Sequence, residues 1–258
     1  MIRQMTQAVL VAGFTLLEYL RSGRIFLELI ATIACYVILL RPTSAAMNAS
    51  YLFAVLGIFG PGMAVITTGF IVGLGDRPQN YIVLTHNVSR DAFLLGLFFA
   101  AVIVTLAMYG ILCALVALFN RATDLTLFGW TLATLPLILN TGLVAAIALL
   151  LSPPVLSAGW RLFVLALIAL ALSSNVISGP VIAQISEINP LLVDLLRAIQ
   201  TILSGPLVPV FYGYQLSVSR AFDSAPAWAN LLAQCLLLLS FLGLARYGFH
   251  RRDLIFSV

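Results

Sequence analysis

Long apolar runs separated by short polar segments set the pattern of this chain. An α-helix needs about 20 predominantly apolar residues to cross a bilayer, and six runs have this character. They predict an all-α polytopic membrane protein, with six transmembrane helices in a single domain over residues 1–258. The predicted spans cover residues 25–40, 51–74, 92–119, 127–151, 162–181 and 228–247.

Residues 3–22 have an amphipathic pattern instead. Polar residues recur near helical spacing on one side, and apolar residues such as Met5, Val9 and Leu20 line the other. Such a helix favours the membrane interface, so we expect an N-terminal interfacial helix that turns into the first span. A slightly polar extra span is the alternative, because residues 8–17 are densely apolar. The polar side comprises Gln4, Gln7, Thr15, Glu18 and Arg21, with Val11 as a gap.

Residues 184–226 are apolar but repeatedly interrupted. The segment is too broken for one span and too apolar for a plain loop. We expect an external pair of short re-entrant or interfacial helices before the last span, shielded by other helices. The interrupting residues are Glu187, Pro190, Asp194, Arg197, Pro206, Pro209, Arg220 and Asp223.

Residues 76–91 form the longest polar interruption in the first half of the chain. Unpaired polar groups are costly in hydrocarbon, so this segment lies on a water side of the membrane. Tyr81, Leu84 and Val88 recur at helical spacing and predict a short amphipathic helix. Ser89 can cap the next helix, and Asp91 then falls in its first turn, where the helix dipole favours a negative charge. A plain connecting loop is the alternative.

Composition supports the membrane assignment. Hydrophobic residues make up 62% of the chain and charged residues only 9%, against about 25% charged in a soluble domain. Six spans within 258 residues leave no room for a soluble catalytic domain. All 13 basic residues are arginines, mostly scattered singly and not gathered into a patch, which argues against a nucleic-acid partner. The three cysteines lie in apolar runs and behave as small hydrophobic residues.

Arginine placement predicts the orientation. With the N-terminus inside and six spans, nine arginines fall on the inner side and four on the outer side, as the positive-inside rule requires. We therefore expect both termini and residues 76–91 to be cytoplasmic. The inner arginines are Arg3, Arg21, Arg24, Arg77, Arg90, Arg161, Arg246, Arg251 and Arg252, and the outer ones are Arg41, Arg121, Arg197 and Arg220.

The sequence lacks the common catalytic motifs. Without lysine there is no G-x-x-x-x-G-K-[ST] phosphate-binding loop, and neither H-E-x-x-H nor a facing pair of intramembrane carboxylates occurs. We expect no enzyme activity, no metal and no cofactor in this chain, and an intramembrane enzyme is a weaker, third hypothesis. Spacing predicts local pairs of Glu28 with Arg24 and of Asp194 with Arg197. Interhelical hydrogen bonding is expected for Asn140, Asn175 and Gln184.

Four short motifs in order resemble ABC-2 type transporter permeases. Leu84 to Arg90 followed by Leu94-Leu95-Gly96 is similar to the cytoplasmic loop between the second and third spans of that family. An amphipathic start ending in Leu20-Arg21-Ser22 resembles its elbow helix. Asn189-Pro190-Leu191 resembles the step before its re-entrant element, and the ending Phe249 to Leu254 resembles its Phe-x-Arg-Arg-Asp-Leu ending.

The resemblance implies a function. It implies an exporter subunit of a bacterial cytoplasmic membrane, paired with a second permease subunit in a homo- or heterodimer and surrounded by lipid. A separate cytoplasmic ATPase would bind ATP and Mg²⁺ and dock on residues 76–91 and on the elbow. The implied docking residues are Glu18, Arg21, Arg77, Tyr81, Leu84, Arg90 and Asp91. The alternative function is a non-transporting scaffold or accessory subunit of a larger membrane complex.

Overall fold

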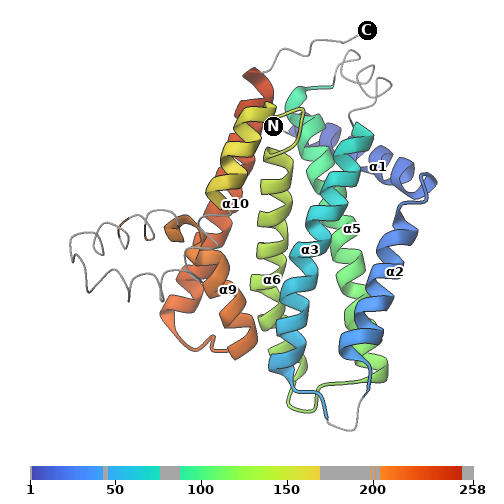
Figure 1. Ribbon diagram of the computed structural model, residues 1–258, viewed down its shortest axis with the longest axis vertical. Coiled ribbons are helices and arrows are strands. Elements are labelled where there is room, and N and C mark those ends of the chain that lie inside the picture. The colour runs from blue at the N-terminus through green and yellow to red at the C-terminus, as the bar shows by residue number, and fades with distance from the viewer. Residues whose placement is uncertain are drawn as a thin grey trace, which may run out of the picture.

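The computed structural model describes residues 2–42, 46–75, 88–168, 198, 201 and 204–251, and these are helices joined by turns and short loops. The long helices lie side by side in a bundle (Figure 1). In order they are α1 (Ile2–Arg21), α2 (Ile25–Cys35) continued by the π-helical turn η1 (Tyr36–Leu40), α3 (Ala49–Gly75), α5 (Arg90–Phe119), α6 (Leu127–Leu150), the 3₁₀ turn η2 (Gly205–Leu207), α9 (Val208–Ser219) and α10 (Ala225–Arg251).

The described helices include four to five candidate membrane spans. By length and composition α3, α5, α6 and α10 can each cross a membrane, and α1 with α2 and η1 adds a fifth if that bent pair counts as one span. The predicted span 162–181 is described only as far as position 168, within the shorter apolar helix Ala158–Ile168, and the rest of it lies outside the described residues. The protein is therefore helical, with four or five candidate membrane spans within the described ranges.

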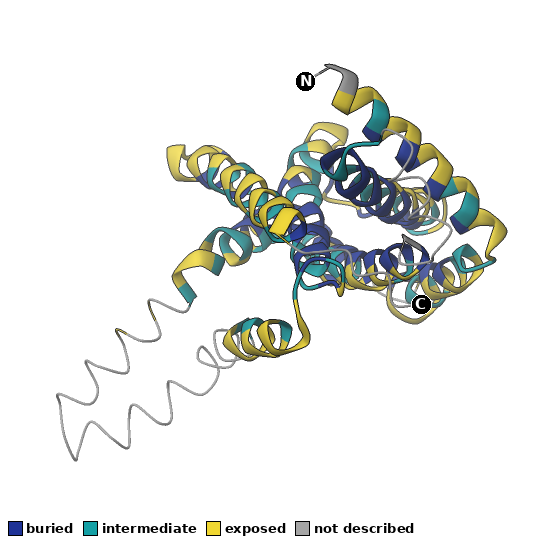
Figure 2. Ribbon diagram, turned by 90° about the horizontal axis from the view of Figure 1, so that it is seen from above, coloured by how far each residue is buried: buried dark blue, intermediate teal, exposed yellow. Residues whose placement is uncertain are grey.

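Viewed from above, buried residues line the sides of the helices that face each other, and the outer sides are exposed (Figure 2). The buried side chains form two clusters, one at each end of the bundle. One joins α1, α3, α5, α6 and α10, and the other joins α3, α5, α6 and α9. An apolar outer surface of this kind suits contact with lipid.

The chain turns sharply between α1 and α2. Gln4–Arg21 and Ile25–Leu40 are bent by 77°, so α1 lies across the end of the bundle while α2 runs along it (Figure 1). Gly23 sits at the bend with φ of 72°, a left-handed conformation that costs glycine little. Ser22 Oγ donates to the carbonyl of Tyr19 at 2.7 Å, which closes the end of α1. The bend therefore separates α1 from α2 where the sequence predicts a turn into the first span, and the interfacial position of α1 stays a prediction.

The exposed and buried residues of α1 differ in part from the polar and apolar sides that the sequence predicts. Met5, Val9 and Leu20 are exposed, as expected for lipid contact. Thr15 was placed on the polar side, yet it is buried together with Val11. The reason is tertiary, because α1 packs mainly against α5, and the strip that α5 covers is Ala8, Val11, Ala12, Thr15 and Tyr19.

Helix α9 is too short to cross the membrane. Its 12 residues span about 18 Å, against a hydrocarbon core of about 30 Å. It packs against α3, α6 and α10, and a turn at Arg220 with φ of 59° leads toward α10. Of the region 184–226, only positions 198, 201 and 204–226 are described, and the re-entrant path predicted for the region stays a prediction.

Buried amides hold the start of α9 within the bundle. Asn140 Nδ2 donates to the Val210 carbonyl at 2.9 Å. Gln234 Nε2 donates to Asn140 Oδ1 at 2.8 Å and to the Pro209 carbonyl at 3.1 Å. Gly213 lies directly against the Gln234 amide, where a Cβ would not fit. The expected interhelical role of Asn140 is confirmed, whereas Asn175 and Gln184 lie outside the described residues.

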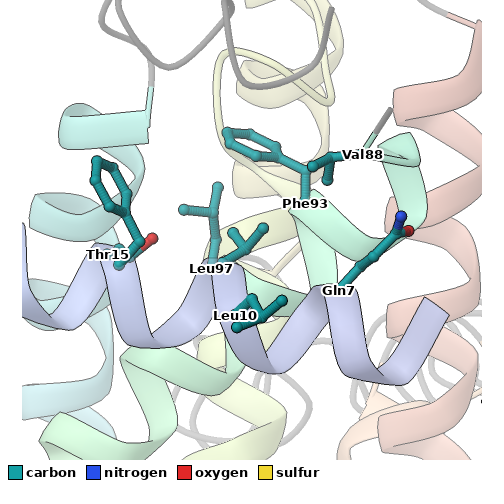
Figure 3. A pocket seen from close by; sticks show the side chains of 8 residues that line it. Gln7, Leu10, Thr15, Val88, Phe93 and Leu97 are labelled. Carbon is teal, nitrogen blue, oxygen red and sulfur yellow. The ribbon is translucent and has the colours of Figure 1, made fainter. Parts of the chain in front are cut away.

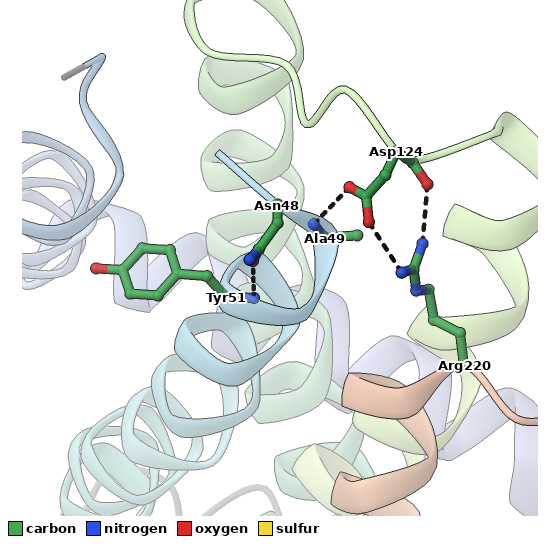
Figure 4. A network of polar contacts seen from close by, with 5 residues as sticks. All are labelled: Asn48, Ala49, Tyr51, Asp124 and Arg220. Atoms are coloured by element: carbon green, nitrogen blue, oxygen red, sulfur yellow. Dashed lines mark hydrogen bonds and ion pairs between the residues drawn. The ribbon is translucent and has the colours of Figure 1, made fainter. Parts of the chain in front are cut away.

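Asp124 is the centre of a network of polar contacts at the end of the bundle opposite to α1 (Figure 4). Its Oδ1 accepts from the Ala49 backbone N–H at 2.8 Å, at the start of α3. Its Oδ2 pairs with Arg220 Nη2 at 2.9 Å, and Arg220 Nη1 donates to the Asp124 carbonyl at 2.9 Å. This loop residue thus connects α3 to the end of α9. The Ala49 N–H, and secondarily Arg220, hold the pKa of Asp124 below its usual value.

Replacing Asp124 with asparagine should therefore lower the thermal unfolding temperature at neutral pH. A carboxyl whose folded pKa is depressed stabilises the fold above its unfolded pKa, and that contribution is lost as pH falls through the folded value. The difference between wild type and Asp124→Asn should shrink below about pH 4. Exposed Asp223, at the same end, provides the control, since Asp223→Asn should change little. A difference in unfolding temperature between wild type and Asp124→Asn that stays constant with pH would contradict this assignment.

Candidate docking face at the α1 end of the bundle

Four elements meet at the α1 end of the bundle. Helix α1 lies across this end, where α3 finishes, α5 begins and α10 finishes (Figure 1). The elbow helix and the two helix ends that flank the predicted docking loop therefore belong to the same end. We call the described part of this end the α1 face, made of α1, residues 88–97 and residues 246–251.

Helix α5 begins as its sequence predicts. The Ser89 side chain accepts from the Ala92 N–H at 3.2 Å, and the Ser89 carbonyl accepts from the Phe93 N–H at 3.0 Å. Asp91 stands in the first turn. The cap fixes where the loop ends and the third long helix starts, so the expected N-cap is confirmed.

Asp91 joins the start of α5 to the end of α10. Arg246 Nη2 lies 2.6 Å from its Oδ2, and His250 Nε2 lies 2.7 Å from its Oδ1. The Asp91 side chain is 8% exposed, whereas those of Arg246 and His250 are 59% and 50% exposed. Arg90 Nη1 donates to the His250 carbonyl at 3.3 Å. The carboxylate therefore anchors a guanidinium and an imidazole that remain accessible at the surface.

An aromatic contact reinforces the same junction. The rings of Phe93 and Phe249 stack with centroids 6.4 Å apart and planes 18° apart. Both side chains are buried. The start of α5 and the end of α10 are thus held together by charge at the surface and by apolar packing beneath it.

Helix α1 is seated on α5 at Gly96. A Cβ added to Gly96 would lie 2.5 Å from Val11 Cγ1 and 3.0 Å from the Ala8 carbonyl oxygen. Only a glycine allows the two backbones this approach. Gly96 ends the Leu94-Leu95-Gly96 motif, so this motif has a physical role as the seat of the interfacial helix.

A pocket of about 210 Å³ opens between α1 and the start of α5 (Figure 3). Its walls are almost entirely apolar, and Gln7 supplies a polar edge. Such a pocket suits an apolar side chain or an acyl chain better than a charged ligand. The lining residues are Gln7, Leu10, Val11, Phe14, Thr15, Val88, Phe93 and Leu97.

The structure places four of the seven predicted docking residues. Glu18 is partly buried and Arg21 is exposed, both near the elbow end of α1. Arg90 and Asp91 lie in the first turn of α5, where Asp91 faces the interior of the protein. Arg77, Tyr81 and Leu84 lie outside the described residues, as does the amphipathic helix expected around them.

Sequence reasoning missed Gly96, Arg246 and His250 as members of this face. Arg246 and His250 were visible only as juxtamembrane charges, 155 and 159 positions away from Asp91 along the chain. Of the two, only His250 stands in the ending that resembles ABC-2 permeases. Gly96 was quoted as part of a motif without a stated role.

A scan of protein-family models and a search of curated proteins gave no match for this chain. Over the described ranges, no group of three or more His, Cys, Asp or Glu side chains is placed to hold a metal ion. What the α1 face offers is a set of accessible arginines beside an apolar pocket. This arrangement can bind another macromolecule or lipid, and it carries no recognisable constellation for covalent chemistry.

Proposed function

We propose that this chain is the permease subunit of an ABC-2 type transporter and works as a dimer with a separate cytoplasmic ATPase. The observation that carries the proposal is the contact of α1 with α5 at Gly96. The elbow helix, through which the family receives force from its ATPase, would thereby act directly on a long helix of the bundle. The short helix α9 before the last long helix supports the same assignment.

A force applied to the α1 face would be transmitted to two of the long helices. A push on α1 or on residues 88–91 would reach α5 through Gly96 and α10 through Asp91 and Phe93. The docking free energy has to differ between two states by only a few kcal/mol, since about 5.5 kcal/mol moves a population from 1:99 to 99:1. These contacts would tilt α5 and α10 together.

The alternative proposal is a non-transporting scaffold or accessory subunit with the same fold. Co-purification separates the two. A tagged full-length chain that functions as a permease should retain an ATPase carrying a Walker motif, and should stimulate its ATP hydrolysis when reconstituted with it. A chain that neither retains nor stimulates such a partner would support the scaffold instead.

Removing two side chains from the loop 76–91 should uncouple ATP hydrolysis by the ATPase from transport. We expect Tyr81→Ala with Arg90→Ala to leave ATP hydrolysis largely intact while transport by the reconstituted complex falls, because the docking contact no longer transmits movement. The control is Arg121→Ala, an exposed arginine at the opposite end of the bundle. Transport per ATP equal to that of wild type in the double variant would remove this loop from the mechanism.

A further inference from the structure

A second pocket opens at the end of the bundle opposite to α1. It has a volume of about 290 Å³ and lies between the end of η1 and the start of α3. Unlike the pocket beside α1, it is lined by several polar side chains as well as by apolar ones, and none of them belongs to the α1 face. The polar lining residues are Arg41, Asn48, Tyr51 and Asn120.

Two backbone carbonyls at the end of η1 hold the walls of this pocket together. The last carbonyls of a helix have no partner within it, and here side chains from other elements donate to them. Tyr51 Oη donates to the Leu39 carbonyl at 2.9 Å, and Asn120 Nδ2 donates to the Leu40 carbonyl at 2.8 Å. The end of η1, the start of α3 and the end of α5 are thereby tied around the pocket. It is therefore preformed, as ligand sites usually are.

The charge in this pocket is unbalanced. Arg41 is exposed, and its guanidinium makes no ion pair or hydrogen bond with any other described residue. No acidic residue lines the pocket within the described ranges. The Asp124 carboxylate at the same end is already held by the Ala49 N–H and by Arg220, and the Tyr51 side chain points away from it (Figure 4). The pocket is thus complementary to a negatively charged group.

Asn48 adds a second donor to the pocket. Its Oδ1 accepts from the Tyr51 N–H at 2.8 Å, which uses the oxygen of the amide and leaves the exposed NH₂ group to donate. A guanidinium and an amide NH₂ that line the same pocket suit a phosphate, because phosphate oxygens accept strong charge-assisted hydrogen bonds.

The apolar surface beside the pocket indicates where such a phosphate comes from. Helix α2 and η1 expose large apolar side chains, among them Ile30, Ile33 and Ile38, and these suit contact with acyl chains. Arg41 follows directly at the end of this apolar run, where a long cationic side chain reaches the headgroup level. Tyrosine is enriched at the same depth, and Tyr51 lines the pocket. A phosphate at this position belongs to a lipid headgroup.

We propose that this pocket binds the headgroup of an anionic membrane phospholipid. The phosphate accepts from Arg41 and from Asn48 Nδ2, and the acyl chains lie along the exposed side of α2. A zwitterionic headgroup is disfavoured because it brings an ammonium group for which the pocket has no acidic partner. The site does not depend on the ATPase, on dimer formation or on a transported substrate.

Lipid titration of the purified full chain in a neutral detergent tests this proposal. Short-chain phosphatidylglycerol should raise the unfolding temperature saturably, which gives an apparent Kd. Arg41→Gln should raise that Kd about tenfold, the equivalent of one hydrogen bond to a charged group. The matched control is Arg121→Gln, because Arg121 is an exposed arginine at the same end that does not line the pocket. Equal weakening in both variants would show a diffuse attraction to arginines and would overturn the site.

Two further probes separate the lipid from other ligands. Phosphatidylcholine with the same acyl chains should bind several-fold more weakly, and inorganic phosphate should not stabilise the protein at the same concentration, because it has no chains to bury. Inorganic phosphate that stabilises as well as phosphatidylglycerol would overturn the lipid assignment. Equal binding of the two lipids would overturn the preference for an anionic headgroup.

A second variant keeps the test decisive if Arg41→Gln does not fold. Asn48→Asp retains an oxygen that can accept from the Tyr51 N–H at the start of α3, but it replaces a donor with a negative charge. It should weaken the binding of phosphatidylglycerol at least as much as Arg41→Gln does, without lowering the unfolding temperature of the lipid-free protein. Unchanged affinity in Asn48→Asp would contradict the proposal.

Discussion

Replacing Gly96 with alanine is expected to lower the stability of this protein by about 1–3 kcal/mol, the usual cost of overpacking a well-packed contact. The added methyl group would lie 2.5 Å from Val11 Cγ1 and 3.0 Å from the Ala8 carbonyl oxygen. A side chain can turn away, but the Ala8 oxygen belongs to the helix backbone, so α1 as a whole has to move. Thermal unfolding in detergent measures the loss of stability.

Gly110→Ala is the matched control, in the same helix. A Cβ at Gly110 meets nothing within 4 Å, and alanine is favoured over glycine within a helix by roughly 0.5–1 kcal/mol. We therefore expect the two substitutions to have opposite signs, with Gly110→Ala neutral or stabilising. If Gly96→Ala also stabilises the protein, α1 does not rest on α5 in this manner.

Removing the Asp91 side chain is the second large expected effect. Breaking a buried ion pair from one side costs roughly 3–5 kcal/mol, and exposed pairs contribute roughly 0–1 kcal/mol. Asp91 is buried while Arg246 and His250 are half-exposed and can be rehydrated. We expect Asp91→Ala to cost about 2 kcal/mol, between these limits, and to loosen the end of α10.

A double-mutant cycle with Arg246→Gln isolates this contact. The single change at Arg246 should cost less than Asp91→Ala, because it leaves His250 paired with Asp91. Combining both changes should cost less than their sum, since the residues share one interaction. Strict additivity would show that Asp91 and Arg246 do not interact in the membrane.

Much of the architecture could be predicted from hydropathy alone. The helices α3, α5, α6 and α10 lie over four of the predicted spans, and the N-cap at Ser89 is a local feature readable from a few residues. The first helix was also readable, because amphipathic periodicity over residues 3–22 predicts a helix that ends where the structure bends. These features depend on interactions between residues that are close in the sequence, so a short stretch of sequence is enough to predict them.

The tertiary contacts could not be predicted in the same way. Spacing pairs Glu28 with Arg24, but α3 offers Arg24 a carbonyl and Glu28 a hydroxyl from positions 39 or more residues distant. Thr15 looks like a solvent-facing residue until α5 covers it. Likewise, nothing near Asp91 in the sequence reveals that its partners stand at the end of the last helix.

Sidedness tests the central claim, that the α1 face is the one that meets a cytoplasmic ATPase. On a background with Cys35, Cys113 and Cys235 replaced by alanine, single cysteines can be placed at Arg21 and at Arg121. Both positions are exposed and lie at opposite ends of the bundle. We predict that a membrane-impermeant thiol reagent labels position 21 only from the cytoplasmic side and position 121 only from the outside. Labelling of position 21 from the outside alone would contradict the account, because no cytoplasmic motor could reach that face.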